Sequence, residues 1–148
     1  MYLRKEKMRE IKFRAFNKEE KRMYFVSSLR FGEFGMEVKV WIDGKEMEVL
    51  GNPYELMQYA GIKDMKEVEV YEGDIIKRYC PCVTVGCTMY WIGEVAIRNG
   101  SLIFRDHNEE TDTQLEMFAE ELLEEEPQIA PLEVIGNIYE NPELVEKE

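Results

Sequence analysis

The chain has 148 residues and a formal net charge of −12, and 45% of its residues are hydrophobic. This length and apolar content predict a single domain that can bury a core without disulfides or a metal. The negative charge opposes that of a phosphate backbone, which argues against direct nucleic-acid binding.

No apolar run reaches the roughly 20 residues that cross a bilayer. The basic N-terminal residues are not followed by the apolar segment of a signal peptide. We therefore expect a cytoplasmic protein that makes no membrane contact. Cytosolic thiols stay reduced, so we expect its cysteines to be free thiols or metal ligands.

We predict that residues 1–8 form a disordered or extended leader and that residues 9–148 form one β-rich domain. From residue 10, apolar and polar side chains alternate as in a strand, and residues 23–27 are predicted to pair with it after a polar turn. Residues 30–35 contain two glycines and are predicted to form a loop.

Two dipeptides predict tight hairpins. Asp43-Gly44 separates alternating strands over residues 36–42 and 45–50, and Asn99-Gly100 separates residues 93–98 from 101–104. A type I′ turn needs positive φ at both central residues, which these residue types tolerate.

Residues 54–79 carry the most regular succession of signals. Residues 53–59 are predicted to form one helical turn that Gly61 ends, and residues 62–64 a turn. A strand around Val68 and Val70 leads into a tight turn at residues 72–74, where Gly73 is free to adopt positive φ. Residues 75–79 form the next predicted strand.

One amphipathic helix is predicted near residues 112–124. Thr111, Asp112 and Thr113 offer N-caps. The apolar residues then recur at helical spacing, which predicts one buried stripe: Leu115, Phe118, Ala119, Leu122 and Leu123. Residues 132–135 are predicted to form a closing strand with a bulge or turn at Gly136, and Asn141-Pro142 to start a short terminal helix.

Eight or nine short strands with one helix indicate a mainly β protein, α+β by element count. We expect a small antiparallel core that resembles a β-barrel or an SH3-like barrel.

Four motifs resemble the YopX protein family, a group found mainly in bacteriophages and prophages. They follow the order of the family and span most of the chain from Arg9: residues 9–16, Leu56-Met-Gln-Tyr59 with Gly61 and Lys63-Asp64, Tyr71-Glu-Gly-Asp-Ile75, and residues 134–144. The resemblance implies a β-rich, barrel-like domain of phage or prophage origin. It brings no known activity, so no catalytic residue can be assigned from it.

The chain departs from the family pattern in two respects. Lys66-Glu67 stands where family members often have an Asn-Gly turn. The cysteine-rich segment at residues 80–88 and the glutamate-rich helix also look particular to this chain.

Cys80, Cys82, Cys87 and His107 are the residue types of a tetrahedral zinc site. Their spacing lacks the usual paired knuckle, because one residue separates the first two cysteines and His107 follows a complete hairpin. A loop of free cysteines is the simpler interpretation, and we expect no cofactor. A thiol nucleophile with His107 as its base needs a contact and an orienting group, Asp106 or Asn108, that a sequence cannot show.

Several carboxylates have structural interpretations. Asp64 and Asp74 are expected to accept backbone N–H bonds within turns. The pairs Glu72/Asp74 and Asp106/Glu109 have the chemistry for acid–base catalysis, but such pairs arise by chance in an acidic chain. Tryptophans and tyrosines on alternating strands are expected in the core or in cross-strand pairs.

We expect a non-enzymatic phage or prophage accessory protein that contacts a host or phage protein. One alternative is an enzyme or small-ligand binder with a cleft beside the barrel, and another is an acidic mimic of DNA that inhibits a nucleic-acid-binding protein. A solvated helix face explains the glutamates equally well. A homo-oligomer or a structural subunit paired through edge strands is a further possibility.

Overall fold

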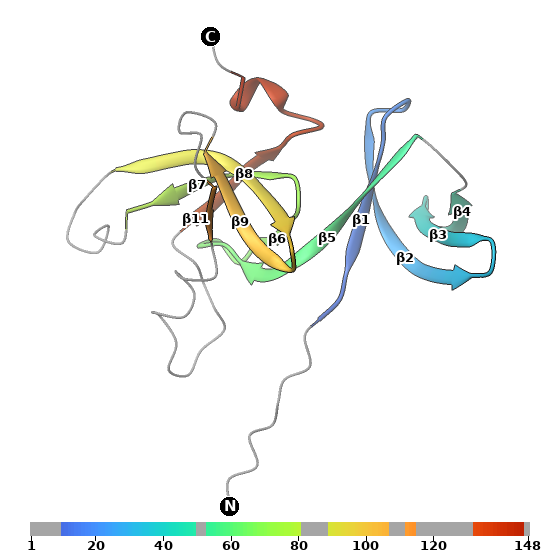
Figure 1. The fold of residues 1–148 in the computed structure, drawn as a ribbon. Coiled ribbons are helices and arrows are strands. Elements are labelled where there is room, and N and C mark those ends of the chain that lie inside the picture. Colours follow the sequence, from blue (N-terminus) through green and yellow to red (C-terminus); the bar gives the residue numbers. More distant parts are fainter. Residues whose placement is uncertain (1–9, 50–52, 81–88, 107–111, 115–131, 147–148) are drawn as a thin grey trace, which may run out of the picture.

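A computed structural model describes residues 10–49, 53–80, 89–106, 112–114 and 132–146. The described residues are almost entirely antiparallel strands (Figure 1). One sheet has the strand order β4-β3-β2-β1-β5-β6, and a second has the order β10-β9-β8-β7-β11. Among the described strands each sheet ends in two different edge strands. The predicted barrel is therefore not found, because neither sheet closes on itself.

The bounds of the elements are β1 (Phe13–Asn17), β2 (Arg22–Gly32), β3 (Gly35–Ile42), β4 (Lys45–Val49), β5 (Tyr54–Lys63), β6 (Glu69–Tyr71), β7 (Asp74–Tyr79), β8 (Tyr90–Arg98), β9 (Ser101–Asp106), β10 (Asp112–Gln114), β11 (Leu132–Asn137) and a 3-10 turn at Pro142–Leu144.

The two dipeptide hairpins are confirmed. Asp43 and Gly44 have φ of 50° and 77°, and Asn99 and Gly100 have φ of 50° and 78°, which is the pattern of a type I′ turn. They join β3 to β4 and β8 to β9, with registers that begin directly beside each turn. These turns formed as predicted because their conformational demand is local.

The predicted loop at residues 30–35 is wrong. β2 continues to Gly32, and β3 begins at Gly35, so only two residues separate the strands. The glycines sit opposite each other at the tip of this hairpin and do not mark a longer loop.

The predicted helical turn at residues 53–59 is also wrong. These residues begin β5, which pairs with β1 from Tyr54 to Gln58 and with β6 from Tyr59 to Lys63. Gly61 does not end the element but lies inside it, with φ of 82°, where the register with β6 shifts. Tertiary pairing on both sides outweighs the weak helical spacing of this segment.

The amphipathic helix is not confirmed. Asp112–Gln114, at its predicted start, forms β10 and pairs with Ile103–Arg105 of β9. Residues 115–124, which carry the apolar stripe, lie outside the described residues, as does the predicted leader at residues 1–8.

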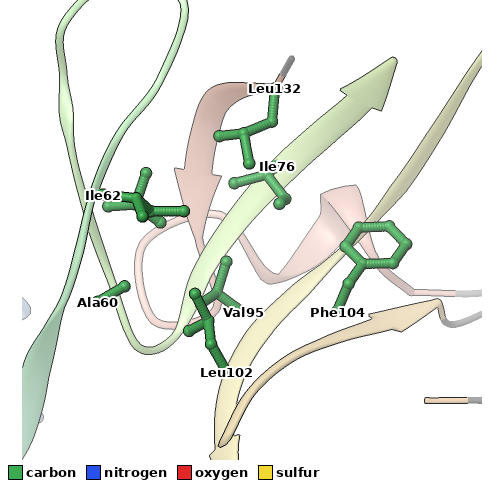
Figure 2. Close-up of a cluster of buried hydrophobic side chains, with 8 residues drawn as sticks. Ala60, Ile62, Ile76, Val95, Leu102, Phe104 and Leu132 are labelled. Atoms are coloured by element: carbon green, nitrogen blue, oxygen red, sulfur yellow. The ribbon is translucent and has the colours of Figure 1, made fainter. Parts of the chain in front are cut away.

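β5 connects two hydrophobic clusters. Tyr54 and Leu56 pack against a cluster formed by Ala15, Tyr24 and Val40. Farther along the same strand, Ala60 and Ile62 belong to a larger cluster, shown in Figure 2, that the second sheet completes. The other buried members of that cluster are Val70, Ile76, Val95, Leu102, Phe104 and Leu132.

The turn at residues 72–74 connects the two sheets. Gly73 has φ of 83° as predicted, and its N–H donates to Val95 O of β8 at 2.8 Å. The Glu72 N–H donates to Gln58 O of β5 at 2.9 Å, and Ile138 N–H donates to Gly73 O at 2.9 Å. Every one of these bonds reaches a different part of the chain, which explains why the motif around residues 71–75 organises the fold.

Candidate functional site

β1 and β2 separate from each other and leave a groove between them. Their ladder runs only from Asn17↔Arg22 to Arg14↔Phe25. Beyond it, the path of β1 stays with β5, because Tyr59 N–H donates to Lys12 O at 2.8 Å. β2 instead follows β3, and the two strands diverge in Figure 1. The groove between them has a volume of about 450 Å³.

The walls of the groove are largely apolar. Ile11 and Phe13 lie on the β1 side, and residues 25–29 and Phe31 lie on the β2 side. Ile11, Phe25 and Phe31 are 69%, 68% and 78% exposed. Large apolar side chains at this exposure around one hollow are typical of a surface that binds another molecule.

A charged network closes one end of the groove. Lys12 Nζ contacts Glu10 Oε1 at 2.8 Å and also pairs with Glu69 Oε1, and the Tyr71 hydroxyl donates to Glu69 Oε2 at 3.1 Å. Hydrogen bonds to Glu10 and Glu69 raise the pKa of Lys12, and burial raises the pKa of Tyr71 to about 12. Lys12 therefore stays charged and Tyr71 neutral at pH 7, so neither is poised for proton transfer there. This end of the groove is suited to binding.

Arg14 and Asp74 form a buried ion pair beneath this network. Arg14 Nη2 donates to Asp74 Oδ1, and the side chains are only 12% and 2% exposed. Tyr71 N–H donates to Asp74 Oδ2 at 2.8 Å, which confirms the predicted turn role of Asp74. Burial raises the pKa of Asp74, and the Arg14 charge and the Tyr71 N–H oppose this shift. The Arg14 guanidinium also lies 4.7 Å from the centre of the Tyr71 ring. This pair positions the groove by joining β1 to the 72–74 turn.

The strands beyond the groove have one apolar face and one charged face. Residues opposite each other in an antiparallel register share a face. The registers of β2, β3 and β4 therefore define an apolar face formed by Leu29, Phe31, Met36, Val38, Met47 and Val49. Arg30, Glu37, Lys39 and Glu48 occupy the opposite, charged face together with Trp41.

This apolar face becomes more exposed away from the core. Val40, which extends it toward the core, is fully buried, whereas Met36 and Met47 are 47% and 50% exposed and Phe31 is 78% exposed. Phe34, at the hairpin tip, is fully exposed. An amphipathic sheet normally covers its apolar face, so an uncovered one indicates a binding surface.

A smaller hollow is lined by polar groups. It has a volume of about 250 Å³ and lies beside the 72–74 turn, between β5, β8 and β9. Its charged side chains are Glu55, Glu72, Glu94, Arg98 and Arg105. Arg105 Nη1 lies 3.8 Å from Glu94 Oε2, so opposite charges neutralise each other within the hollow.

The predicted zinc ligands are only partly described. Cys80 is disulfide-bonded, which differs from the expected free thiol. Cys82, Cys87 and His107 lie outside the described residues, so both the zinc site and the thiol nucleophile stay untested predictions. Within the described part of the chain, no three cysteine, histidine or acidic side chains gather as a metal site would require.

The remaining candidates have structural surroundings. Asp64 accepts bonds from Lys66 N–H and Val68 N–H within its turn, as predicted. It also accepts one from Val134 N–H of β11 at 2.9 Å, which the sequence did not reveal. Asp106 is buried on β9, whereas Glu109 lies outside the described residues. Trp91 packs against the larger hydrophobic cluster.

A model of the YopX protein family matches residues 12–146. The chain belongs to the YopX family. No curated protein matches its sequence. Two solved structures are similar to this YopX-family chain. Protein EF1440 from Enterococcus faecalis is 26% identical with a TM-score of 0.52, and the alignment covers 93% of this chain and 99% of that protein. Protein yopX from Bacillus subtilis is 21% identical with a TM-score of 0.59, over 91% of this chain and 98% of that one. The second likeness supports the fold alone.

In this YopX-family chain, no helix of the described segments is long and apolar enough to cross a membrane. The groove was missed at the sequence level, although both of its walls had been predicted as strands. The one available signal was length: β2 is 11 residues and β1 is five, so part of β2 has to extend beyond its partner.

Proposed function

We propose that this chain is a non-enzymatic phage or prophage accessory protein that acts in the host cytoplasm by contacting a host or phage protein. The observation that carries this proposal is the uncovered apolar face of β2, β3 and β4, which is continuous with the groove beside β1. Contiguous exposed apolar surface on a folded protein commonly marks an interaction site, particularly where polar groups surround it.

The charge of the chain narrows the kind of partner. A net charge of −12 favours association with a protein that has a basic surface and disfavours one that is acidic. The apolar face supplies the area that excludes water, while the surrounding charge supplies steering and selectivity. We infer that complex formation weakens at high salt without being abolished, because the apolar contribution is not screened.

The proposal is tested by affinity capture from host lysate with three forms of the full chain. The wild type is compared with a Phe31→Lys/Met36→Lys variant of the apolar face and with Trp41→Lys. Trp41 is 50% exposed but lies on the opposite face, so it is a matched control. We expect a protein retained by the wild type and by Trp41→Lys and lost from the double variant. Equal retention by all three forms, or none above a blank resin, would overturn the proposal.

A second candidate function is the binding of a small apolar ligand in the groove. Its volume of about 450 Å³ and its aromatic walls, with Lys12 and Tyr71 at one end, favour this alternative. Mass spectrometry of the native protein after gentle purification distinguishes the two. A stoichiometric small molecule that is lost in a Phe25→Lys variant would favour ligand binding over a protein partner.

The DNA-mimic alternative depends on the glutamate-rich stretch at residues 116–126, which lies outside the described residues. It predicts that a captured partner is released by DNA in competition. Release by DNA together with indifference to the Phe31→Lys/Met36→Lys change would favour mimicry over contact through the apolar face.

A further inference from the structure

β2 pairs with two strands in succession rather than with two at once. Residues 22–25 pair with β1, and residues 26–32 pair with β3. The change of partner coincides with a register irregularity between Val26 and Ser28. No described strand pairs with the other edge of residues 27–32, and that edge faces the groove. Part of β2 is therefore an open sheet edge.

The hairpin at Asp43-Gly44 identifies which backbone groups point to this edge. Residues that flank a two-residue hairpin loop exchange both N–H···O bonds, so Ile42 and Lys45 form a hydrogen-bonded pair. Bonding alternates along a strand, so Val38 directs its backbone groups toward β4. Glu37 directs its own toward β2.

The register then settles the orientation of β2. Arg30 is opposite Glu37 and is bonded to β3, whereas Leu29 and Phe31 are opposite Val38 and Met36. By the same alternation, the N–H and C=O groups of Leu29 and Phe31 point away from β3 and into the groove. Two residues of one strand thus present unpaired backbone donors and acceptors beside an apolar wall.

The other edge of this part of the sheet is protected differently. Three of the five residues of β4 are charged: Lys45, Glu46 and Glu48. Charged side chains on an edge strand oppose the addition of a further strand. Within residues 28–32 of β2, Arg30 is the one charged residue, and its side chain lies on the charged face. The edge inside the groove lacks the protection that β4 has.

We propose that the groove receives an extended segment of the partner protein as an additional strand along β2, paired through Leu29 and Phe31. This proposal rests on the proposed function and specifies its binding mode. Backbone bonds to Leu29 and Phe31 provide affinity, and the apolar walls select side chains at alternate positions of the segment.

The chemistry of the segment follows from its surroundings. Side chains on one face of the added strand continue the apolar face beside Leu29 and Phe31, so these positions take aliphatic or aromatic residues. Basic residues at the other positions complement a chain with net charge −12. The same charge disfavours a second copy of the chain, because two acidic molecules would have to pair edge to edge.

The test uses hydrogen exchange of the full-length protein, followed residue by residue by NMR. Peptides are first selected from a displayed random library against the wild-type chain. We expect enriched peptides to alternate apolar and basic or polar residues. In the free protein, the amide of Arg30 exchanges slowly and those of Leu29 and Phe31 exchange fast. A bound peptide slows exchange at Leu29 and Phe31 by at least about tenfold and leaves Arg30 unchanged.

Two matched changes separate strand addition from simple apolar contact. N-methylation of the peptide amides that face β2 removes donors needed by the ladder and is expected to abolish binding, whereas methylation of the alternate amides leaves it intact. Phe31→Lys in the protein is expected to weaken binding by about tenfold or more, and Met47→Lys, on the same face beside the protected edge, by less than about twofold.

The proposal is overturned if no peptide is enriched, if enriched peptides have helical spacing, or if exchange slows elsewhere than at Leu29 and Phe31. Self-association in light scattering that is lost in Phe31→Lys would show that a second copy occupies the edge, which also overturns it. The proposed function fails separately: it stands if a captured protein depends on the apolar face while Leu29 and Phe31 remain unprotected in that complex.

Discussion

Arg14 and Asp74, 60 residues apart in the sequence, form a buried ion pair that joins β1 to the turn between β6 and β7. The carboxylate also accepts the N–H of Tyr71, and the guanidinium lies over the ring of the same residue. One side-chain pair thus connects the groove wall to the turn that bonds both sheets.

Removing one charge of this pair is expected to destabilise the fold strongly. Asp74→Asn keeps the acceptor for Tyr71 N–H but leaves Arg14 buried without its counter-charge, which costs about 3–5 kcal/mol of the free energy of unfolding. Urea denaturation of the variant and the wild type measures the difference.

The double variant Arg14→Met/Asp74→Asn supplies the control. Because it removes both charges, its loss of stability is expected to be smaller than the sum of the two single losses. Additive losses would show that the two residues act independently.

Asp64 is expected to be important for stability because it serves three backbone donors. Its carboxylate accepts from Lys66 and Val68 in its own turn and from Val134 on β11. Asp64→Ala leaves these N–H groups without an acceptor in a buried place, at about 1–3 kcal/mol for each group that water does not reach. Asp64→Asn, which retains one side-chain oxygen, is expected to lose less stability in thermal and urea unfolding. Equal losses in the two variants would contradict this account.

Gly93 is expected to tolerate no side chain. A Cβ there would lie 2.3 Å from Arg105 O and 2.7 Å from an atom of the Phe104 ring. Gly93→Ala therefore has to displace β9 or the core ring and is expected to cost at least about 1–3 kcal/mol. Gly32→Ala is a suitable comparison, because its nearest neighbour is 3.8 Å away. Similar unfolding midpoints for the two alanine variants would disprove the packing argument.

Glu69 is expected to make stability depend on acid pH. Its hydrogen bond to Lys12 lowers its pKa below the ordinary value of 4.5. A carboxyl group with a depressed folded-state pKa stabilises the fold above its unfolded pKa, and this contribution is lost as the pH falls through the folded value. The stability difference between the wild type and Glu69→Gln should therefore be present above pH 4.5 and disappear below it. A difference that persists in strong acid would show that charge is not its source, and high salt should reduce it.

Local chemistry was sufficient for the hairpins at Asp43-Gly44 and Asn99-Gly100, for the turn at Gly73 and for the bulge at Gly136, where the register of β11 shifts. In each case a residue type with unusual backbone freedom decides the conformation without help from distant residues. The family was likewise evident from short motifs in order, and the match over residues 12–146 confirms it.

Segments without such a signal were predicted less well. Residues 54–59 have apolar side chains three apart, yet they pair on one side with β1 and continue into a pairing with β6. A loop was predicted at residues 30–35 because its glycines suit either a loop or a tight hairpin. The outcome in both places depends on which partner strand is available, and that information lies elsewhere in the chain.

The candidate site belongs to the same category. Alternation along β1 and β2 was enough to predict two strands that pair, and composition was enough to predict an acidic protein with a core. The groove exists because β1 stays with β5 while β2 turns to β3, and the Arg14–Asp74 pair exists because a turn from the second sheet reaches β1. Both depend on contacts between segments tens of residues apart, whose free energy comes from tertiary packing and is absent from any short stretch of sequence.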